Sequence, residues 1–214
     1  MLFRLEARPE ASRRMRYLSP IFAIALTLVG SLILFFALGK DPIESFKIFF
    51  FNPVRDLYGV SELFLKATPL MLIAVGLAVG YRANIWNIGA EGQFILGAIA
   101  ATGVALYFQH SNSIWVLPMM IVAGAVGGGL WAAIPAFLRT RFHANEILVT
   151  LMMVYIAQFF SSWLIHDPWK DPQGFNFPQT TMFADSALLP LLIEGSRLNL
   201  AFLFALATLA VAYI

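Results

Sequence analysis

The chain has 214 residues, of which 60% are hydrophobic and 12% are charged, and its formal net charge at pH 7 is +2. Its mean hydropathy of +0.78 is far above that of a soluble domain of this length, which predicts an integral membrane protein. The small net charge, with arginines gathered at the N-terminus, argues against binding to nucleic acid. With no cysteine and three scattered histidines, we expect no disulfide, no metal site and no cofactor.

Apolar runs with few charges predict an all-α transmembrane bundle of about six spans, because a hydrocarbon core about 30 Å thick requires about 20 helical residues. The expected spans cover about residues 17–38, 63–81, 93–108, 114–138, 147–165 and 198–214. The second span contains Lys66 and Pro69, and the third is short. Either of these two is therefore a candidate for a broken or partly re-entrant element.

The N-terminal tail, residues 1–16, contains five arginines and is expected to remain cytoplasmic by the positive-inside rule. Residues 17–214 form the expected transmembrane domain, with a proline-rich external loop at about 166–197. A cleaved signal peptide ending near Ala37-Leu38-Gly39 is the competing interpretation of the start. The first apolar run is longer than the roughly 7 to 15 residues of a signal peptide, which favours an uncleaved span. We therefore expect a multi-pass protein of the inner (plasma) membrane.

A polar motif, Tyr81-Arg-Ala-Asn-Ile-Trp-Asn-Ile-Gly-Ala-Glu-Gly-Gln-Phe94, separates the second and third apolar runs. A charged side chain at the centre of a membrane helix costs roughly 2.5 to 3.5 kcal/mol on insertion scales. Glu91 is therefore expected to face a cavity, a protein partner or the membrane interface. The neighbouring Gly89 and Gly92 permit a sharp turn or a close approach of another backbone.

Two roles remain open for the polar motif: supporting broken backbone, and contacting a transported solute. Amide side chains offer both donors and acceptors, which a neutral polyol or nucleoside requires. The candidates for a substrate path are Asn84, Asn87, Glu91, Gln93 and Gln158. Arg82 and Glu91 are a candidate gate pair. Thr150, Ser161 and Ser162 are weaker candidates, because such hydroxyls often bond to their own helix carbonyls.

Two further patterns concern packing and partners. The spacings Gly76-x-x-x-Gly80 and Gly124-x-x-x-Gly128 predict close contacts between helices. The short cytoplasmic turn after the fourth span contains Arg139, Arg141 and Glu146, which are candidates for contact with a partner subunit. Ordinary positive-inside anchoring is the alternative interpretation of this turn.

Three separated blocks are Thr68-Pro-Leu-Met-Leu-Ile-Ala-Val-Gly-Leu-Ala-Val79, Asn87-Ile-Gly-Ala-Glu-Gly-Gln93 with Gly97-Ala98, and Asn145-Glu-Ile-Leu-Val-Thr-Leu-Met-Met153 with Tyr155-Ile-Ala157. Together, and in this order, they resemble the permease subunits of ABC importers for nucleosides and simple sugars, which are similar to branched-chain amino acid permeases. Val154 stands where this family usually has asparagine. Such permeases are commonly much longer, so the resemblance implies that the chain corresponds to an N-terminal half.

The resemblance implies a non-enzymatic membrane subunit that works with a second permease subunit, cytoplasmic ATPase subunits and an external solute-binding lipoprotein. The chain contains no Gly-x-x-x-x-Gly-Lys-Ser/Thr loop, so ATP hydrolysis is expected on a separate chain. Two alternatives remain open: a proton-coupled secondary carrier built around Glu91, and a truncated remnant or scaffold that transports nothing. No span combines a nucleophile with a base or clusters acids with histidines, which argues against an intramembrane enzyme.

Overall fold

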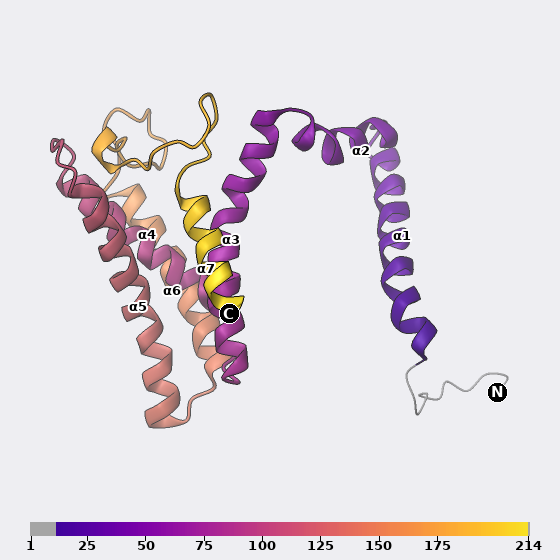
Figure 1. Ribbon diagram of the computed structural model, residues 1–214, viewed down its shortest axis with the longest axis horizontal. Coiled ribbons are helices and arrows are strands. Elements are labelled where there is room, and N and C mark those ends of the chain that lie inside the picture. Colours follow the sequence, from indigo (N-terminus) through magenta and orange to yellow (C-terminus); the bar gives the residue numbers. More distant parts are fainter. Residues whose placement is uncertain (1–11, 214) are drawn as a thin grey trace. The chain divides into compact units, whose positions relative to one another are not determined.

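The computed structural model describes residues 12–213, and the regular structure of these residues is helical except for one antiparallel bridge between Leu191 and Asn199 (Figure 1). The long elements are α1 (Arg13–Ala37), α2 (Pro42–Phe50), α3 (Leu57–Arg82), α4 (Ala90–Tyr107), α5 (Val116–Phe142), α6 (Glu146–His166) and α7 (Ala201–Tyr213). Two 3-10 turns, η1 (Asn52–Val54) and η2 (Asp185–Ala187), lie in the connections. The predicted all-α fold is confirmed.

Five of the described helices, namely α1, α3, α4, α5 and α6, are long and apolar enough to cross a membrane. They correspond to the first five expected spans. The sixth expected span corresponds to α7, an apolar helix of 13 residues. Helix α3 continues through Pro69, and α4 is regular over its 18 residues. The expectation of a break within one of these spans is therefore wrong, and the irregular backbone lies between them.

By its contacts the chain divides into two units, Met1–Leu63 and Phe64–Ile214. In the first unit, a sharp connection separates α1 from α2. The Asp41 side chain begins α2 by accepting hydrogen bonds from the backbone N–H groups of Ile43 (2.8 Å) and Glu44 (3.0 Å). Such a cap satisfies donors that have no partner in the first turn.

Helices α4 and α5 of the second unit approach each other closely through glycines. A Cβ atom added at Gly97 would lie 2.9 Å from the carbonyl oxygen of Gly124, and one at Gly128 would lie 3.0 Å from that of Gln93. Since apolar burial contributes little between helices inside lipid, such backbone proximity favours their packing. The predicted contact through Gly124 and Gly128 is confirmed. At Gly76, by contrast, an added Cβ would meet no described atom within 4 Å, so this glycine makes no such contact.

A three-residue turn joins α5 to α6. His143 adopts a left-handed conformation (φ 54°) and ends α5. The Asn145 side chain then accepts hydrogen bonds from the N–H groups of Ile147 (3.0 Å) and Leu148 (3.3 Å), which begins α6. The two helices consequently run in opposite directions.

The connections of the second unit lie at its two opposite ends (Figure 1). The α5–α6 turn and the C-terminal end of α3 are at one end, and the long connection from α6 to α7 is at the other. This long connection is held to the α4–α5 loop, where the Ser186 hydroxyl donates to the carbonyl of Ser111 at 2.6 Å. The order of the elements agrees with alternating membrane crossings. Which end is cytoplasmic remains a prediction.

Candidate functional site

The polar motif after α3 turns back and runs along the beginning of α6. Asn84 takes a left-handed conformation (φ 55°), and the residues from there to α4 are not helical. The backbone N–H of Trp86 donates to Glu146 at 2.8 Å. Further along, a Cβ atom added at Gly89 would lie 2.7 Å from Thr150, and one at Gly92 would lie 3.1 Å from Val154. Because both sequence numbers increase together, the motif and α6 run in the same direction.

Because the motif runs beside α6, helix α4 begins inside the second unit and not at the end where the α5–α6 turn lies. Val154 lies about 12 Å along α6 from its first residue, at roughly 1.5 Å per residue. Gly92, which packs on Val154, is in the first turn of α4. We call residues 83–89 the re-entrant segment, because their backbone turns back and packs along the first turns of α6. Glycine is required at Gly89 because the backbone there touches Thr150 directly.

Glu146 holds the re-entrant segment to both neighbouring helices. One of its carboxylate oxygens accepts the hydrogen bond from Trp86, and the other forms an ion pair with Arg139 near the end of α5. The Glu146 side chain is only 14% exposed. Glu146 and Arg139, which were candidates for partner contact, thus contact each other, whereas Arg141 is exposed in the last turn of α5.

The structure brings Glu91 together with Gln158. The Gln158 side-chain amide donates to Glu91 Oε1 at 3.1 Å, which links the first turn of α4 to the middle of α6. Both side chains are exposed in the isolated chain. No ion pair joins Glu91 to Arg82 among the described residues, so the gate pair has no direct contact in this conformation.

Asn87 and Gln93 line the same small cavities. The Asn87 side-chain oxygen accepts a hydrogen bond from the N–H of Gly89 at 2.9 Å, which supports the turn into α4. Both residues border one cavity of about 200 Å³ beside Arg139 and another of about 340 Å³ beside α3. Asn84 is exposed and borders neither cavity.

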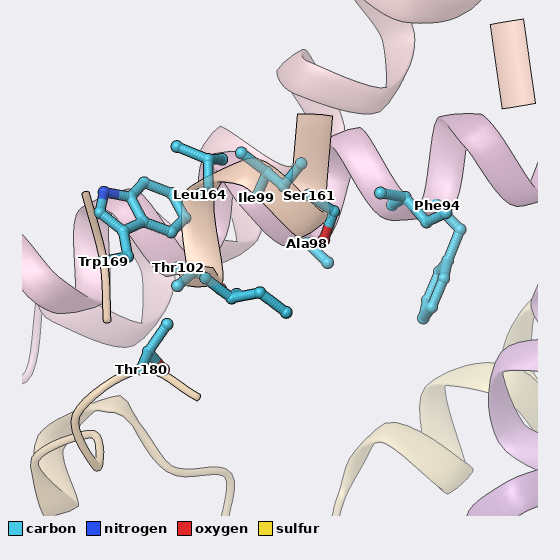
Figure 2. A pocket seen from close by; sticks show the side chains of 10 residues that line it. Phe94, Ala98, Ile99, Thr102, Ser161, Leu164, Trp169 and Thr180 are labelled. Carbon is cyan, nitrogen blue, oxygen red and sulfur yellow. The ribbon is translucent and has the colours of Figure 1, made fainter. Parts of the chain in front are cut away.

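A separate cavity of about 290 Å³ lies between α4, α6 and the connection that follows α6. Figure 2 shows Trp169 at one end, Phe94 at the other, and Ser161 with Ala98 between them. Trp169, Thr102 and Thr180 were not among the expected site residues. Thr102 lies in α4, whereas Trp169 and Thr180 lie in the connection after α6, so no local spacing indicated that these residues meet.

The other two hydroxyl candidates bond within α6. Thr150 donates to the carbonyl of Ile147 at 3.2 Å, and the Ser162 hydroxyl lies 3.4 Å from His166 Nδ1. The largest of these cavities, about 640 Å³, lies on the α3 and α5 side of α4 and is almost entirely apolar.

A buried polar atom lies beside Gly92. The indole nitrogen of Trp131 is buried and has no hydrogen-bond partner among the described residues. A Cβ atom added at Gly92 would lie 3.3 Å from this nitrogen and 3.1 Å from the Cα atom of Val154. The valine at position 154 therefore leaves an apolar side chain near a donor that an asparagine amide would be able to satisfy.

Comparison with known proteins identifies related sequences. Residues 59–214 match the family described as branched-chain amino acid transport system / permease component. The chain is 34% identical over 186 residues to the glucose ABC transporter permease protein TsgB13 of Haloferax volcanii, covering 87% of this chain and 48% of that protein. It is 31% identical over 194 residues to the guanosine ABC transporter permease protein NupP of Bacillus subtilis, covering 88% and 54%.

A third relative is the nucleoside ABC transporter permease protein NupB of Lactococcus lactis subsp. cremoris, which is 27% identical over 203 residues, covering 92% of this chain and 56% of that protein. The chain thus spans about half the length of these curated relatives. No solved structure matches it.

Proposed function

We propose, since the chain belongs to the family of branched-chain amino acid transport system permease components, that it is the membrane-spanning permease subunit of an ATP-driven importer. The match over residues 59–214 carries this proposal, because it includes the re-entrant motif and all of α4, α5 and α6. The motif offers amide and carboxylate groups between membrane spans, which is where a permease handles its solute.

The proposed solute is a nucleoside or a simple sugar. The relatives TsgB13 and NupP are named for glucose and guanosine, two neutral molecules rich in hydrogen-bonding groups. Asn87, Gln93 and Gln158 offer both donors and acceptors, which suits a solute that has no net charge to pair. Together with Asn84 and Glu91 they remain the proposed substrate path.

The proposed partners are cytoplasmic ATPase subunits, a second permease subunit and an external solute-binding lipoprotein. The 214 residues contain no nucleotide-binding loop, which supports hydrolysis on another chain. Arg141 is exposed in the last turn of α5, next to the α5–α6 turn, and is the best placed of the three residues proposed for partner contact. Arg139 and Glu146 support this turn from within through their ion pair.

Uptake measurements test the transport proposal. The chain is expressed together with its proposed ATPase, permease and binding-protein partners, in a strain unable to take up guanosine or glucose. We expect uptake of one labelled solute to require this chain and to stop when arsenate depletes ATP. Uptake that survives arsenate but is abolished by a protonophore would indicate a proton-coupled carrier. The absence of uptake with the full set of partners would indicate a remnant or scaffold.

The same assay tests the role proposed for Glu91. Glu91→Gln keeps the shape and can still accept the hydrogen bond from Gln158, whereas Glu91→Ala removes both charge and acceptor. If the charge forms a gate with Arg82 in another conformation, both variants lose uptake, and Arg82→Gln adds little to Glu91→Gln. If Glu91 only supports the fold, Glu91→Gln transports normally and Glu91→Ala lowers thermal stability.

A further inference from the structure

Helix α6 carries a line of polar side chains next to an apolar face. Large apolar residues of one exposed face are Met152, Ile156, Phe159 and Trp163, whose exposed fractions are 66%, 53%, 74% and 53%. Beside them, separated by steps of three and four residues, are Tyr155, Gln158, Ser162 and His166. Residues at such spacing share one side of a helix. We call these four residues the polar stripe, and all of them are exposed in the isolated chain.

Contacts connect the polar stripe to α4 and along α6. Gln158 donates to Glu91 Oε1 at 3.1 Å, and Glu91 Oε2 has no hydrogen-bond partner among the described residues. Nearer the end of the helix, His166 Nδ1 lies 2.7 Å from the carbonyl oxygen of Ser162. Gln158 is thus joined to the carboxylate of Glu91, and Ser162 is joined to His166 one turn further along the same side of α6. We call the polar stripe together with this carboxylate the polar row.

The contact between Glu91 and Gln158 lies far from either end of α6. Gln158 lies about 18 Å along α6 from Glu146, and the whole helix is about 32 Å long at roughly 1.5 Å per residue. A hydrocarbon core is about 30 Å thick, so the contact between Glu91 and Gln158 lies near its middle. An acidic side chain facing lipid at this depth costs roughly 2.5 to 3.5 kcal/mol. The adjacent apolar face of α6 carries no such cost and is suited to lipid.

We infer that the polar stripe and Glu91 line a water-filled pathway along α6, and that its occupant is a neutral solute with several hydroxyl or N–H donors. The open Oε2 of Glu91 accepts such donors, while the Gln158 amide and the Tyr155 and Ser162 hydroxyls offer both donors and acceptors. The choice of solute rests on the proposed function. The inferred pathway adds Tyr155, Ser162 and His166 to the proposed substrate path. The neighbouring apolar face of α6 is assigned to lipid.

Cysteine accessibility tests this inference, because the natural chain contains no cysteine. Tyr155→Cys and Ser162→Cys probe the polar stripe, and Ile156→Cys and Trp163→Cys are matched controls one residue away on the apolar face. Membranes from cells that express the chain with its proposed partners are treated with a charged, membrane-impermeant methanethiosulfonate. We expect both cysteines of the polar stripe to react at least about tenfold faster than their controls, because charged reagents reach only hydrated thiols.

Solute protection tests the occupant. Guanosine or glucose should slow modification of Tyr155→Cys and Ser162→Cys, while an unrelated charged solute should not. Reaction rates equal to those of the controls would overturn the pathway, as would oxidative cross-linking of Ser162→Cys between two copies of the chain without modification by the reagent. Since Ser162→Cys changes little more than one atom, this site reports on the pathway even where Tyr155→Cys disturbs folding.

Failure of the two proposals can be told apart. Modification depends on water and not on ATP, so a reactive polar stripe in a complex that takes up no solute would refute transport and leave the pathway standing. Fast modification that neither guanosine nor glucose slows would refute the proposed occupant. Normal uptake with an unreactive polar stripe would support the permease function and overturn the pathway along α6.

Discussion

At the scale of single residues, the re-entrant motif depends on places where no side chain fits. Gly89 and Gly92 bring the backbone against Thr150 and Val154, and a methyl group at Gly89 would come within 2.7 Å of both the side chain and the carbonyl oxygen of Thr150. To remove this clash the backbone of Thr150 would have to move, since its carbonyl group is part of the contact. These glycines therefore determine how closely the start of α4 can approach α6.

We predict that Gly89→Ala destabilises the protein by roughly 1 to 3 kcal/mol, the usual cost of overpacking a close contact. Thermal unfolding of the purified protein in detergent, followed by size-exclusion chromatography, measures the change. Gly129→Ala is the control, because a Cβ atom at Gly129 of α5 would meet no described atom within 4 Å. Equal melting temperatures for the two variants would show that the Gly89 contact is absent in the membrane protein.

At the scale of elements, the notable connection is the one between α3 and α4. Its backbone has neither helical nor strand hydrogen bonds over most of its length, so its position depends on neighbours. Glu146 supplies this link by joining Trp86 of the re-entrant segment to Arg139 of α5, while Asn145 caps the same helix end. Two adjacent residues thus begin α6 and attach the segment to it.

We expect Glu146→Ala to loosen the re-entrant segment, since it removes the acceptor for Trp86 and the partner of Arg139. Loss of such bonds costs about 1 to 3 kcal/mol, so hydrogen–deuterium exchange across residues 83–89 should accelerate roughly tenfold or more. Glu146→Gln keeps an acceptor and should have a smaller effect.

Glu44→Ala is the matched control for the exchange measurement. It removes a carboxylate from an exposed i,i+3 pair with Lys47, in which both side chains are 62% exposed and the atoms are 3.8 Å apart. An exposed pair of this kind contributes little to stability. Unchanged exchange in Glu146→Ala would show that other contacts hold the segment.

At the scale of the whole molecule, membrane orientation decides which end of the second unit would meet the proposed cytoplasmic partners. We predict from the positive-inside rule that cysteines at Ser12 and Thr140 are labelled only from the cytoplasmic side, and one at Gln173 only from outside. Arg139 and Arg141 flank Thr140, and Gln173 lies in the long connection before α7. Labelling of Thr140 from outside would contradict the arrangement of spans and relocate the re-entrant segment to the outer half of the membrane.

The positions of the helices follow from local properties of the sequence. Long apolar runs predicted α1, α3, α4, α5 and α6, because a bilayer imposes helical hydrogen bonding on each run separately. The close packing of α5 through Gly124 and Gly128 was also predicted, because a small-residue spacing of four is visible within one helix. The polar motif between α3 and α4 was correctly located for the same reason, as its residues are consecutive.

What only the tertiary structure decided is which distant residues meet. The sequence indicated Glu91 and Gln158 separately, but it paired Glu91 with Arg82, which is nearer in the chain, whereas the structure shows the hydrogen bond to Gln158. It made Glu146 a candidate for partner contact, which stays a prediction, but it did not indicate the contacts of that side chain with Trp86 and Arg139. These contacts depend on the path of the backbone between α3 and α4. That path is set by packing against α6, because side chains far apart in sequence meet only when helices are placed in a common register.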